Sequence, residues 1–214
     1  MTAGRTPDPI TPMWRGVIAF RALTWAFACG TVIIQTGHYR REGAAWAILG
    51  VMAVWSVVSS FLYLRERTRP PALVVFDLVL TTALLLTSPW VLSNTQFALN
   101  VPLITTVWAA VPPVAAGARF GAAGGVLAGL VVGVATGLAR EKFDLDVARD
   151  GVLLAAAGLL VGMAATMGRR SAARLEQALR KEAATASGRS SSASRPAASA
   201  TAWTSPGAAG SRRW

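Results

Sequence analysis

The chain has 214 residues, of which 53% are hydrophobic and only 14% are charged. Soluble domains carry about 25% charged residues, so this composition excludes an ordinary soluble enzyme or binding domain. The net charge of +11 comes from Lys and Arg in short loops and in the C-terminal tail, as in membrane proteins, and does not indicate binding to nucleic acid.

Charged residues are absent from five long segments, at residues 22–39, 43–64, 78–118, 120–139 and 151–168. Apolar runs of roughly 18 residues or more can cross a bilayer as helices. The longest segment exceeds one crossing and is interrupted by Pro, Ser, Asn and Gln at residues 88–96. The sequence therefore predicts an all-α, polytopic membrane protein with six transmembrane helices, at residues 17–36, 44–64, 72–87, 98–116, 120–138 and 151–168.

The fourth of these helices should be the least regular, kinked or broken near its end, because it contains Pro102, Pro112 and Pro113. Six crossings leave both termini on the same side of the membrane. Basic residues favour the cytoplasmic side. Both termini are expected there because twelve basic residues fall on their side of the membrane and five on the other. The twelve are Arg5, Arg15, Arg21, Arg65, Arg67, Arg69, Arg119, Arg169, Arg170, Arg174, Arg180 and Lys181. The five are Arg40, Arg41, Arg140, Lys142 and Arg149.

The predicted organisation is a polar N-terminal segment at 1–13, a six-helix transmembrane domain at 14–168, a cytoplasmic helix at 169–186 and a disordered tail at 187–214. Leu175 and Leu179 are four residues apart, and Glu176 precedes Arg180 by four, which favours a charged helix after the last crossing. The tail holds eight Ser, four Arg and no acidic residue, a composition that cannot bury a core.

Two ionisable residues, Arg21 and Asp77, lie inside predicted membrane helices. Both sit roughly 9–10 Å from the cytoplasmic end of their helices at 1.5 Å per residue. Since an unpaired charge inside a bilayer is unfavourable, we expect the two to form an ion pair. Such a pair either fixes the order of the helices or is separated by a stimulus; a proton path would need further partners.

The most specific local pattern is a ladder of glycines spaced four apart around the fifth predicted helix: Gly117, Gly121, Gly125, Gly129, Gly133 and Gly137. The sixth predicted helix adds Gly158 and Gly162 at the same spacing. Glycine at this spacing lets a second helix backbone approach closely. The ladder predicts either static packing between neighbouring helices or a contact that transmits a signal or forms a dimer.

No pattern in the sequence indicates a soluble active site, a cofactor or a metal. Asp144, Asp146 and Asp150 lack EF-hand spacing, so a solvated loop is the better interpretation. His38 is the only histidine and Cys29 the only cysteine, which supports neither a zinc site nor a Ser-His-Asp arrangement nor an intramolecular disulfide. The sequence therefore predicts no catalytic, cofactor-binding or metal-binding residues.

The segments WRGVIAFRALTWAF, FLYLRERTRP, PALVVFDLVLTTALLL and RRSAARLEQALRKEAATA together resemble the N-terminal membrane region of MacS-type sensor histidine kinases of high-GC Gram-positive bacteria. The resemblance covers about residues 13–186. It implies a membrane input module of a two-component system that dimerises through its membrane helices and the charged helix. In that family an ATP-dependent protein-histidine kinase follows, whose phosphoacceptor histidine passes phosphate to a response regulator.

After Ala186 the chain departs from that family, because SGRSSSASRPAASATAWTSPGAAGSRRW contains no histidine or acidic residue. His38 lies on the predicted outer side and cannot replace the phosphoacceptor. We therefore expect an input module truncated, or frameshifted, before its kinase domains. It would not itself be a kinase, and it would use a response regulator only if those domains were present.

Two alternatives remain from the residues alone: a small transporter or channel subunit, and a structural membrane protein whose basic tail touches anionic lipid. The expected partners are the lipid bilayer and a second copy of the chain, with no nucleic acid, and the expected location is the plasma membrane.

Overall fold

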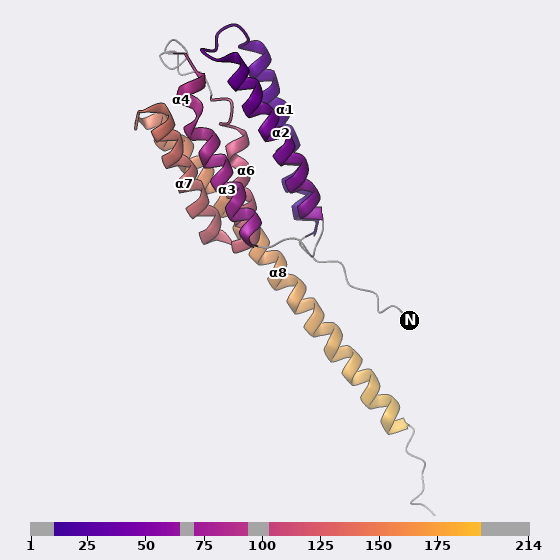
Figure 1. Ribbon diagram of the computed structural model, residues 1–214. Coiled ribbons are helices and arrows are strands. Elements are labelled where there is room, and N and C mark those ends of the chain that lie inside the picture. Colours follow the sequence, from indigo (N-terminus) through magenta and orange to yellow (C-terminus); the bar gives the residue numbers. More distant parts are fainter. Residues whose placement is uncertain (1–10, 65–70, 94–102, 194–214) are drawn as a thin grey trace, which may run out of the picture. The chain divides into compact units, whose positions relative to one another are not determined.

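The computed structural model describes residues 11–64, 71–93 and 103–193, with the backbone alone described at residue 11 and at 187–193. All regular structure within these ranges is helical, which confirms the all-α prediction (Figure 1). In chain order the elements are α1 (Thr11–Ile34), α2 (Glu42–Leu64), α3 (Pro71–Leu86), α4 (Ser88–Val91), the 3-10 helix η2 (Trp108–Ala110), α6 (Val111–Phe120), α7 (Ala122–Arg140) and α8 (Leu145–Ala193).

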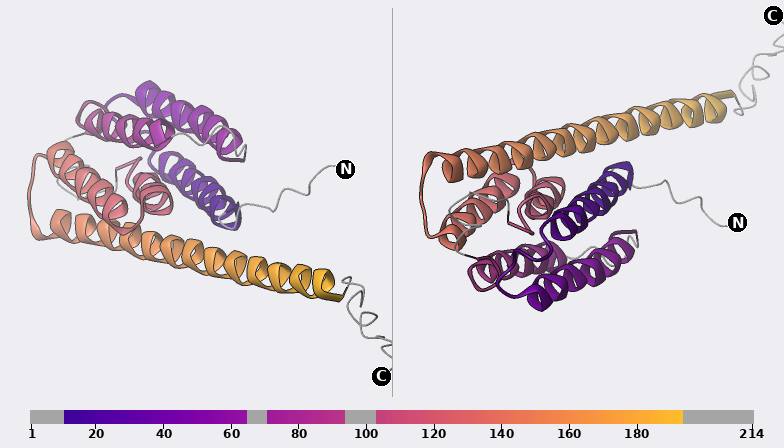
Figure 2. Two further views of the ribbon diagram at one scale, coloured as in Figure 1. Left: turned by 90° about the horizontal axis from the view of Figure 1, so that it is seen from below. Right: turned by 90° about the horizontal axis from the view of Figure 1, so that it is seen from above.

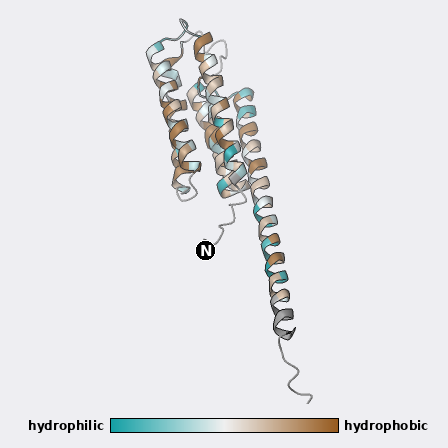
Figure 3. Cartoon of the chain, turned by 90° about the vertical axis from the view of Figure 1, so that its right-hand side faces the viewer, coloured by the Kyte–Doolittle hydropathy of each residue, from teal (hydrophilic) through white to brown (hydrophobic). Residues whose placement is uncertain are grey.

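Five stretches of helix within the described residues are long and apolar enough to cross a membrane: Pro12–Ile34, Glu42–Leu64, Pro71–Val91, Ala122–Arg140 and Leu145–Ala186. Many large apolar side chains on these helices remain exposed; Phe27, Val54 and Leu127 are 55%, 66% and 65% exposed. Figure 3 shows hydrophobic residues along the whole length of the bundle helices. A multi-pass membrane protein accounts for these faces, because hydrocarbon would cover them.

The chain divides into two compact units, residues 1–170 and 171–214. In the first unit α1 packs on α2, while α3 packs on α6 and α7. Figure 2 shows α6 in the interior of this bundle, and α6 also contacts α1 and α7. Seven of its residues are buried: Val111, Pro112, Pro113, Ala115, Ala116, Gly117 and Ala118.

The predicted transmembrane helix at 98–116 is wrong in the part that the structure describes; residues 98–102 lie outside the described ranges. Residues 104–107 form turns, η2 follows, and α6 begins only at Val111 and continues to Phe120. The proline pair explains the difference: proline is favoured in the first helical turn, where a missing N–H loses no bond, and Pro112 and Pro113 therefore begin this helix rather than break it near its end.

The other boundaries shift by a few residues. A short helix, α4, occupies the start of the loop predicted after residue 87, and α8 begins at Leu145, within the loop predicted to extend to residue 150. At its other end α8 continues to Ala193, so the backbone at 187–193 is helical where the composition predicted disorder. No proline lies between Leu145 and Pro196, and serine and alanine are compatible with a helix. Residues 194–214 lie outside the described ranges.

Candidate functional site: a buried charged centre

The structure brings Arg21 of α1 and Asp77 of α3 together as a buried ion pair. The guanidinium Nη2 of Arg21 donates to the carboxylate Oδ2 of Asp77. The two side chains are 1% and 0% exposed, so the pair is isolated from both solvent and lipid. Breaking a buried pair by removing one partner leaves an uncompensated charge, which is strongly destabilising.

Two tryptophans complete the surroundings of this pair. The indole Nε1 of Trp55, on α2, donates to the other carboxylate oxygen of Asp77 at 2.6 Å. The guanidinium carbon of Arg21 lies 5.4 Å from the centre of the Trp108 ring, a cation–π geometry. Trp108 is itself fully buried, and its Nε1 donates to the Ser56 hydroxyl at 3.3 Å. Helices α1, α2 and α3 and the segment before α6 therefore meet at one charged centre.

The hydrogen bonding of this centre is uneven. Both oxygens of Asp77 accept a bond, but Nε and Nη1 of Arg21 find no acceptor among the described residues. The buried hydroxyl of Thr81, one helical turn beyond Asp77, is also without a partner there. Buried polar groups are nearly always hydrogen-bonded, so Nε and Nη1 of Arg21 and the Thr81 hydroxyl are the groups of this centre whose hydrogen bonding the described residues leave incomplete.

The N-terminal end of α1 is attached to the C-terminal end of α2 by an aromatic stack. The rings of Trp14 and Tyr63 lie 4.7 Å apart with 24° between their planes. Both side chains are almost completely buried, together with Val17, Leu73 and Ala118. This apolar cluster therefore joins the first turns of α1 to the last turns of α2 and to neighbouring residues of α3 and α6.

The glycine ladder packs against the neighbouring helix α8 of the same chain. A Cβ on Gly125 would collide with the backbone of Gly158, and a Cβ on Gly129 would lie 2.5 Å from the Cα of Ala155. Gly133 and Gly151 face each other in the same way. The packing alternative is therefore what these residues show in the structure, since the backbone of one helix occupies the space that a side chain would need.

The ladder is not one continuous helical stripe, contrary to the sequence-based expectation. Gly117 belongs to α6, and Gly121 lies in the turn before α7 with φ of 80°, a conformation that favours glycine. Gly117 and Gly125 nevertheless both face Gly158, and Gly162 faces the backbone of Gly121 and Ala122. Gly137 instead packs against the Phe143 ring of the following loop.

The turn between α6 and α7 is attached to α8 by a side chain. Arg169 donates from Nη1 to the carbonyl of Ala118 at 3.0 Å, in the last turn of α6. A cation near the C-terminal end of a helix is favourable because the last carbonyls there lack helical partners. Arg169 therefore attaches α8 to the interior of the first unit.

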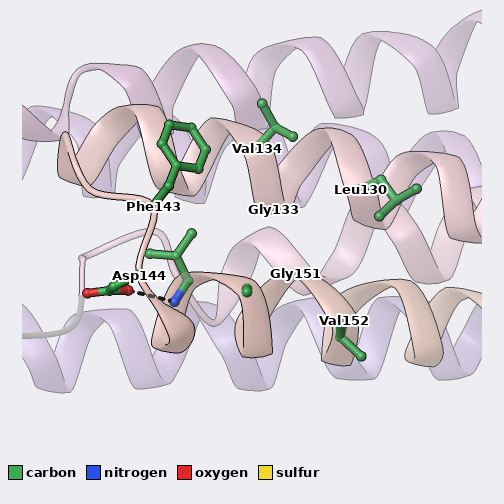
Figure 4. A pocket seen from close by; sticks show the side chains of 9 residues that line it. Leu130, Gly133, Val134, Phe143, Asp144, Gly151 and Val152 are labelled. Atoms are coloured by element: carbon green, nitrogen blue, oxygen red, sulfur yellow. Dashed lines mark hydrogen bonds between the residues drawn. The ribbon is translucent and has the colours of Figure 1, made fainter.

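A cavity of about 220 Å³ lies between α7 and the start of α8 and is lined mainly by aliphatic side chains (Figure 4). Asp144 at its edge is not free to bind a ligand through Oδ1, which accepts the backbone N–H of Val147 at 3.0 Å and caps the start of α8. Within the described residues no three His, Cys, Asp or Glu side chains are placed to hold a metal ion. His38 lies in the turn after α1, where Gly37 donates to Glu42 at 2.5 Å.

Comparison with protein families gives one match. A profile described as a family of unknown function, DUF5931, matches residues 10–176. The chain belongs to this family. No curated protein and no solved structure matches the chain. The DUF5931 region includes every residue of the charged centre and of the glycine contacts, and it ends six residues into the second unit.

Sequence reasoning singled out Arg21 and Asp77 but missed Trp55, Trp108 and Ser56. The available signal was the position of the two tryptophans: both lie in the interior of apolar segments, whereas tryptophan in membrane helices is enriched at the interfaces. A mid-membrane indole N–H needs an acceptor, and here Asp77 and Ser56 provide it.

Proposed function

We propose that this DUF5931 chain is the membrane input module of a two-component sensor histidine kinase of the MacS type. The observation that carries the proposal is α8, a single helix that contains both the last membrane-spanning stretch and the charged segment after Arg169. In such a module a change among the membrane helices reaches the output through the rotation or displacement of one helix. The sequence resemblance over residues 13–186 supports the same conclusion.

The charged centre is the proposed switch of this module. It joins α1, α2 and α3 to the segment before α6, and α6 in turn is bound by Arg169 of α8. Rearrangement of the Arg21–Asp77 pair would therefore alter contacts that continue to the base of the charged helix. Arg21 and Asp77 are the charged members of the buried polar and charged side chains described, and one charged pair near one end of its helices favours sensing over transport, whose sites lie near the bilayer midplane.

A register scan tests the proposal. Residues 1–186 are joined to the dimerisation and ATP-binding domains of a MacS-type kinase, and one to four alanines are inserted after Ala184. If α8 transmits a rotation, autophosphorylation in membrane vesicles should vary with a period of about 3.6 inserted residues. The isolated kinase domains with the same insertions are the control. Equal activity at every insertion length would contradict transmission through α8.

The proposed topology has six crossings with both ends of the chain in the cytoplasm, and among the described residues the turns before η2, η2 itself and α6 belong to the fourth crossing. Two contacts support it. The backbone N–H of Arg40, after α1, donates to the carbonyl of Val91 at the end of α4, which places these ends together. Gly121, which precedes α7, lies against Thr166, near the middle of α8. The chain therefore has to return through the bundle between α4 and α7, and non-helical backbone is tolerated there because protein covers it.

Cysteine labelling tests the topology. In a Cys29→Ala background, His38→Cys and Arg174→Cys are expected to lie on opposite sides of the plasma membrane. A membrane-impermeant maleimide added to intact cells should label the first variant alone, and both after the cells are broken. Labelling of Arg174→Cys in intact cells would refute the orientation.

A second copy of the chain is the proposed partner, paired through the second unit. Leu175 and Leu179 are 62% and 56% exposed and lie on one face of α8, where an equivalent helix could cover them. With Cys29 replaced by alanine, Leu175→Cys should form an intermolecular disulfide in membranes, whereas Gln177→Cys, on the opposite face, is the matched control. Equal cross-linking of the two variants would argue against a specific pair.

A further inference from the structure

A groove of about 420 Å³ lies between α1 and α2 and shares Ser56 with the surroundings of the charged centre. Trp25 of α1 and Ala53, Ser56, Ser60 and Phe61 of α2 are among its lining residues. Its volume falls within the range of roughly 300–1,000 Å³ that is typical of small-molecule sites. Trp25 is held in place because its Nε1 donates to the Leu49 carbonyl at 3.3 Å.

The surroundings of the groove define which molecules can reach it. Both helices are candidate membrane spans, and their neighbouring side chains are apolar and exposed, with Leu23 and Val57 at 68% and 70%. In a membrane these faces contact acyl chains. A ligand of this groove must therefore dissolve in the bilayer and carry a hydrocarbon body.

Two serine hydroxyls distinguish the groove from a plain lipid-facing surface. Ser56 uses its oxygen to accept the Trp108 N–H, which leaves its own hydrogen for a further acceptor. Ser60, one turn later, makes no hydrogen bond with the described residues although it lines the groove. Its neighbour Ser59 differs: it is fully buried and donates to the Trp55 carbonyl of its own helix at 2.7 Å. A hydroxyl facing hydrocarbon without a partner is unfavourable, so a ligand that pairs with it gains affinity.

From these features we propose that the groove between α1 and α2 binds a membrane-dissolved amphipathic molecule, with a hydrocarbon body along Trp25 and Phe61 and one hydroxyl or carbonyl group on Ser60 and Ser56. The same Ser56 holds Trp108, whose ring lies against Arg21. A ligand in the groove would therefore touch a residue, Ser56, that is joined to the charged centre by a single hydrogen bond from Trp108. The statement that this ligand is the input rests on the proposed sensor function; the binding itself does not.

Photolabelling of the full chain in phosphatidylcholine nanodiscs tests the site. The probe is a long-chain alkanol with a mid-chain diazirine, and the control probe is the alkane with the same diazirine. Labelled residues are identified by mass spectrometry with and without excess unlabelled alkanol. Three variants are compared with the unaltered chain: Ser60→Ala removes the free hydroxyl, Ser59→Ala is its matched control, and Ala53→Phe fills the groove.

We expect competable labelling by the alkanol at the groove residues, abolished by Ala53→Phe. Ser60→Ala should weaken the competition about fivefold, the effect of one lost hydrogen bond, while Ser59→Ala leaves it unchanged. Equal competition in Ser60→Ala and Ser59→Ala, or equal saturable labelling by the alkane, would overturn the proposal. So would the absence of competable labelling at the groove residues of the unaltered chain. Because no kinase output is measured, these results are independent of the register scan.

Discussion

Replacement of Asp77 by asparagine removes the charge of the buried carboxylate and keeps its shape. The asparagine can still accept one hydrogen bond, but it leaves the positive charge of Arg21 buried and uncompensated at 1% exposure. Removal of one partner of a buried pair costs about 3–5 kcal/mol, and an unpaired arginine within a membrane helix about 2.5–3.5 kcal/mol. We therefore expect Asp77→Asn to lower the free energy of unfolding by about 3–4 kcal/mol.

The double variant Arg21→Met/Asp77→Leu separates pairing from other effects. It removes both charges and leaves the Trp55 N–H without its acceptor, a loss of about 1 kcal/mol. Replacing a buried pair by apolar residues is otherwise often neutral or stabilising, so the double variant should be more stable than either matching single variant, Asp77→Leu or Arg21→Met.

Unfolding by sodium dodecyl sulfate in mixed micelles, followed by tryptophan fluorescence, measures these free energies. Arg174→Met, at an exposed position of α8, controls for the loss of an arginine and should change stability by less than about 0.5 kcal/mol. If the destabilisation of the double variant equalled the sum of the two single variants, the charges would not be coupled and the proposed switch would be refuted.

Three further outcomes are expected. Gly125→Ala should destabilise the bundle by about 1–3 kcal/mol in the same assay because the added Cβ meets the Gly158 backbone. Gly50→Ala, with open space around the added Cβ, should be neutral or stabilising. Equal effects of the two substitutions would contradict the close approach of the helices at Gly125. Asp144→Ala should lose about 1 kcal/mol with the cap at Val147, and Asp144→Asn should retain most of it, measured by the same titration. Burial raises the pKa of Tyr39 above its usual value near 10. The stability that its neutral form contributes is therefore complete below that pH and is lost as the pH rises through the higher folded-state pKa. Tyr39→Phe should abolish this decline of stability at alkaline pH.

Much of the fold was readable because it depends on local composition. The length of each uncharged segment predicts a crossing, and the structure has helices at five of the six predicted places. The prolines correctly predicted that the fourth segment is irregular, but not that the pair at 112–113 begins a helix, because the same residue type either interrupts a helix or begins one. Whether a proline interrupts or begins a helix depends on whether the backbone groups before it find hydrogen-bond partners outside the helix. The surrounding bundle decides this.

The candidate site divides in the same way. Arg21 and Asp77 stand out in the sequence because a charge inside an apolar run demands compensation, and the spacing of the glycines indicates that a second backbone approaches. The sequence by itself thus determined the membrane-spanning character, the two charges and the small-residue face. Only the tertiary structure decided that α8 fills that face and that Trp55, Trp108 and Ser56 surround the ion pair, because these partners come from distant segments and no local periodicity specifies which of them meet.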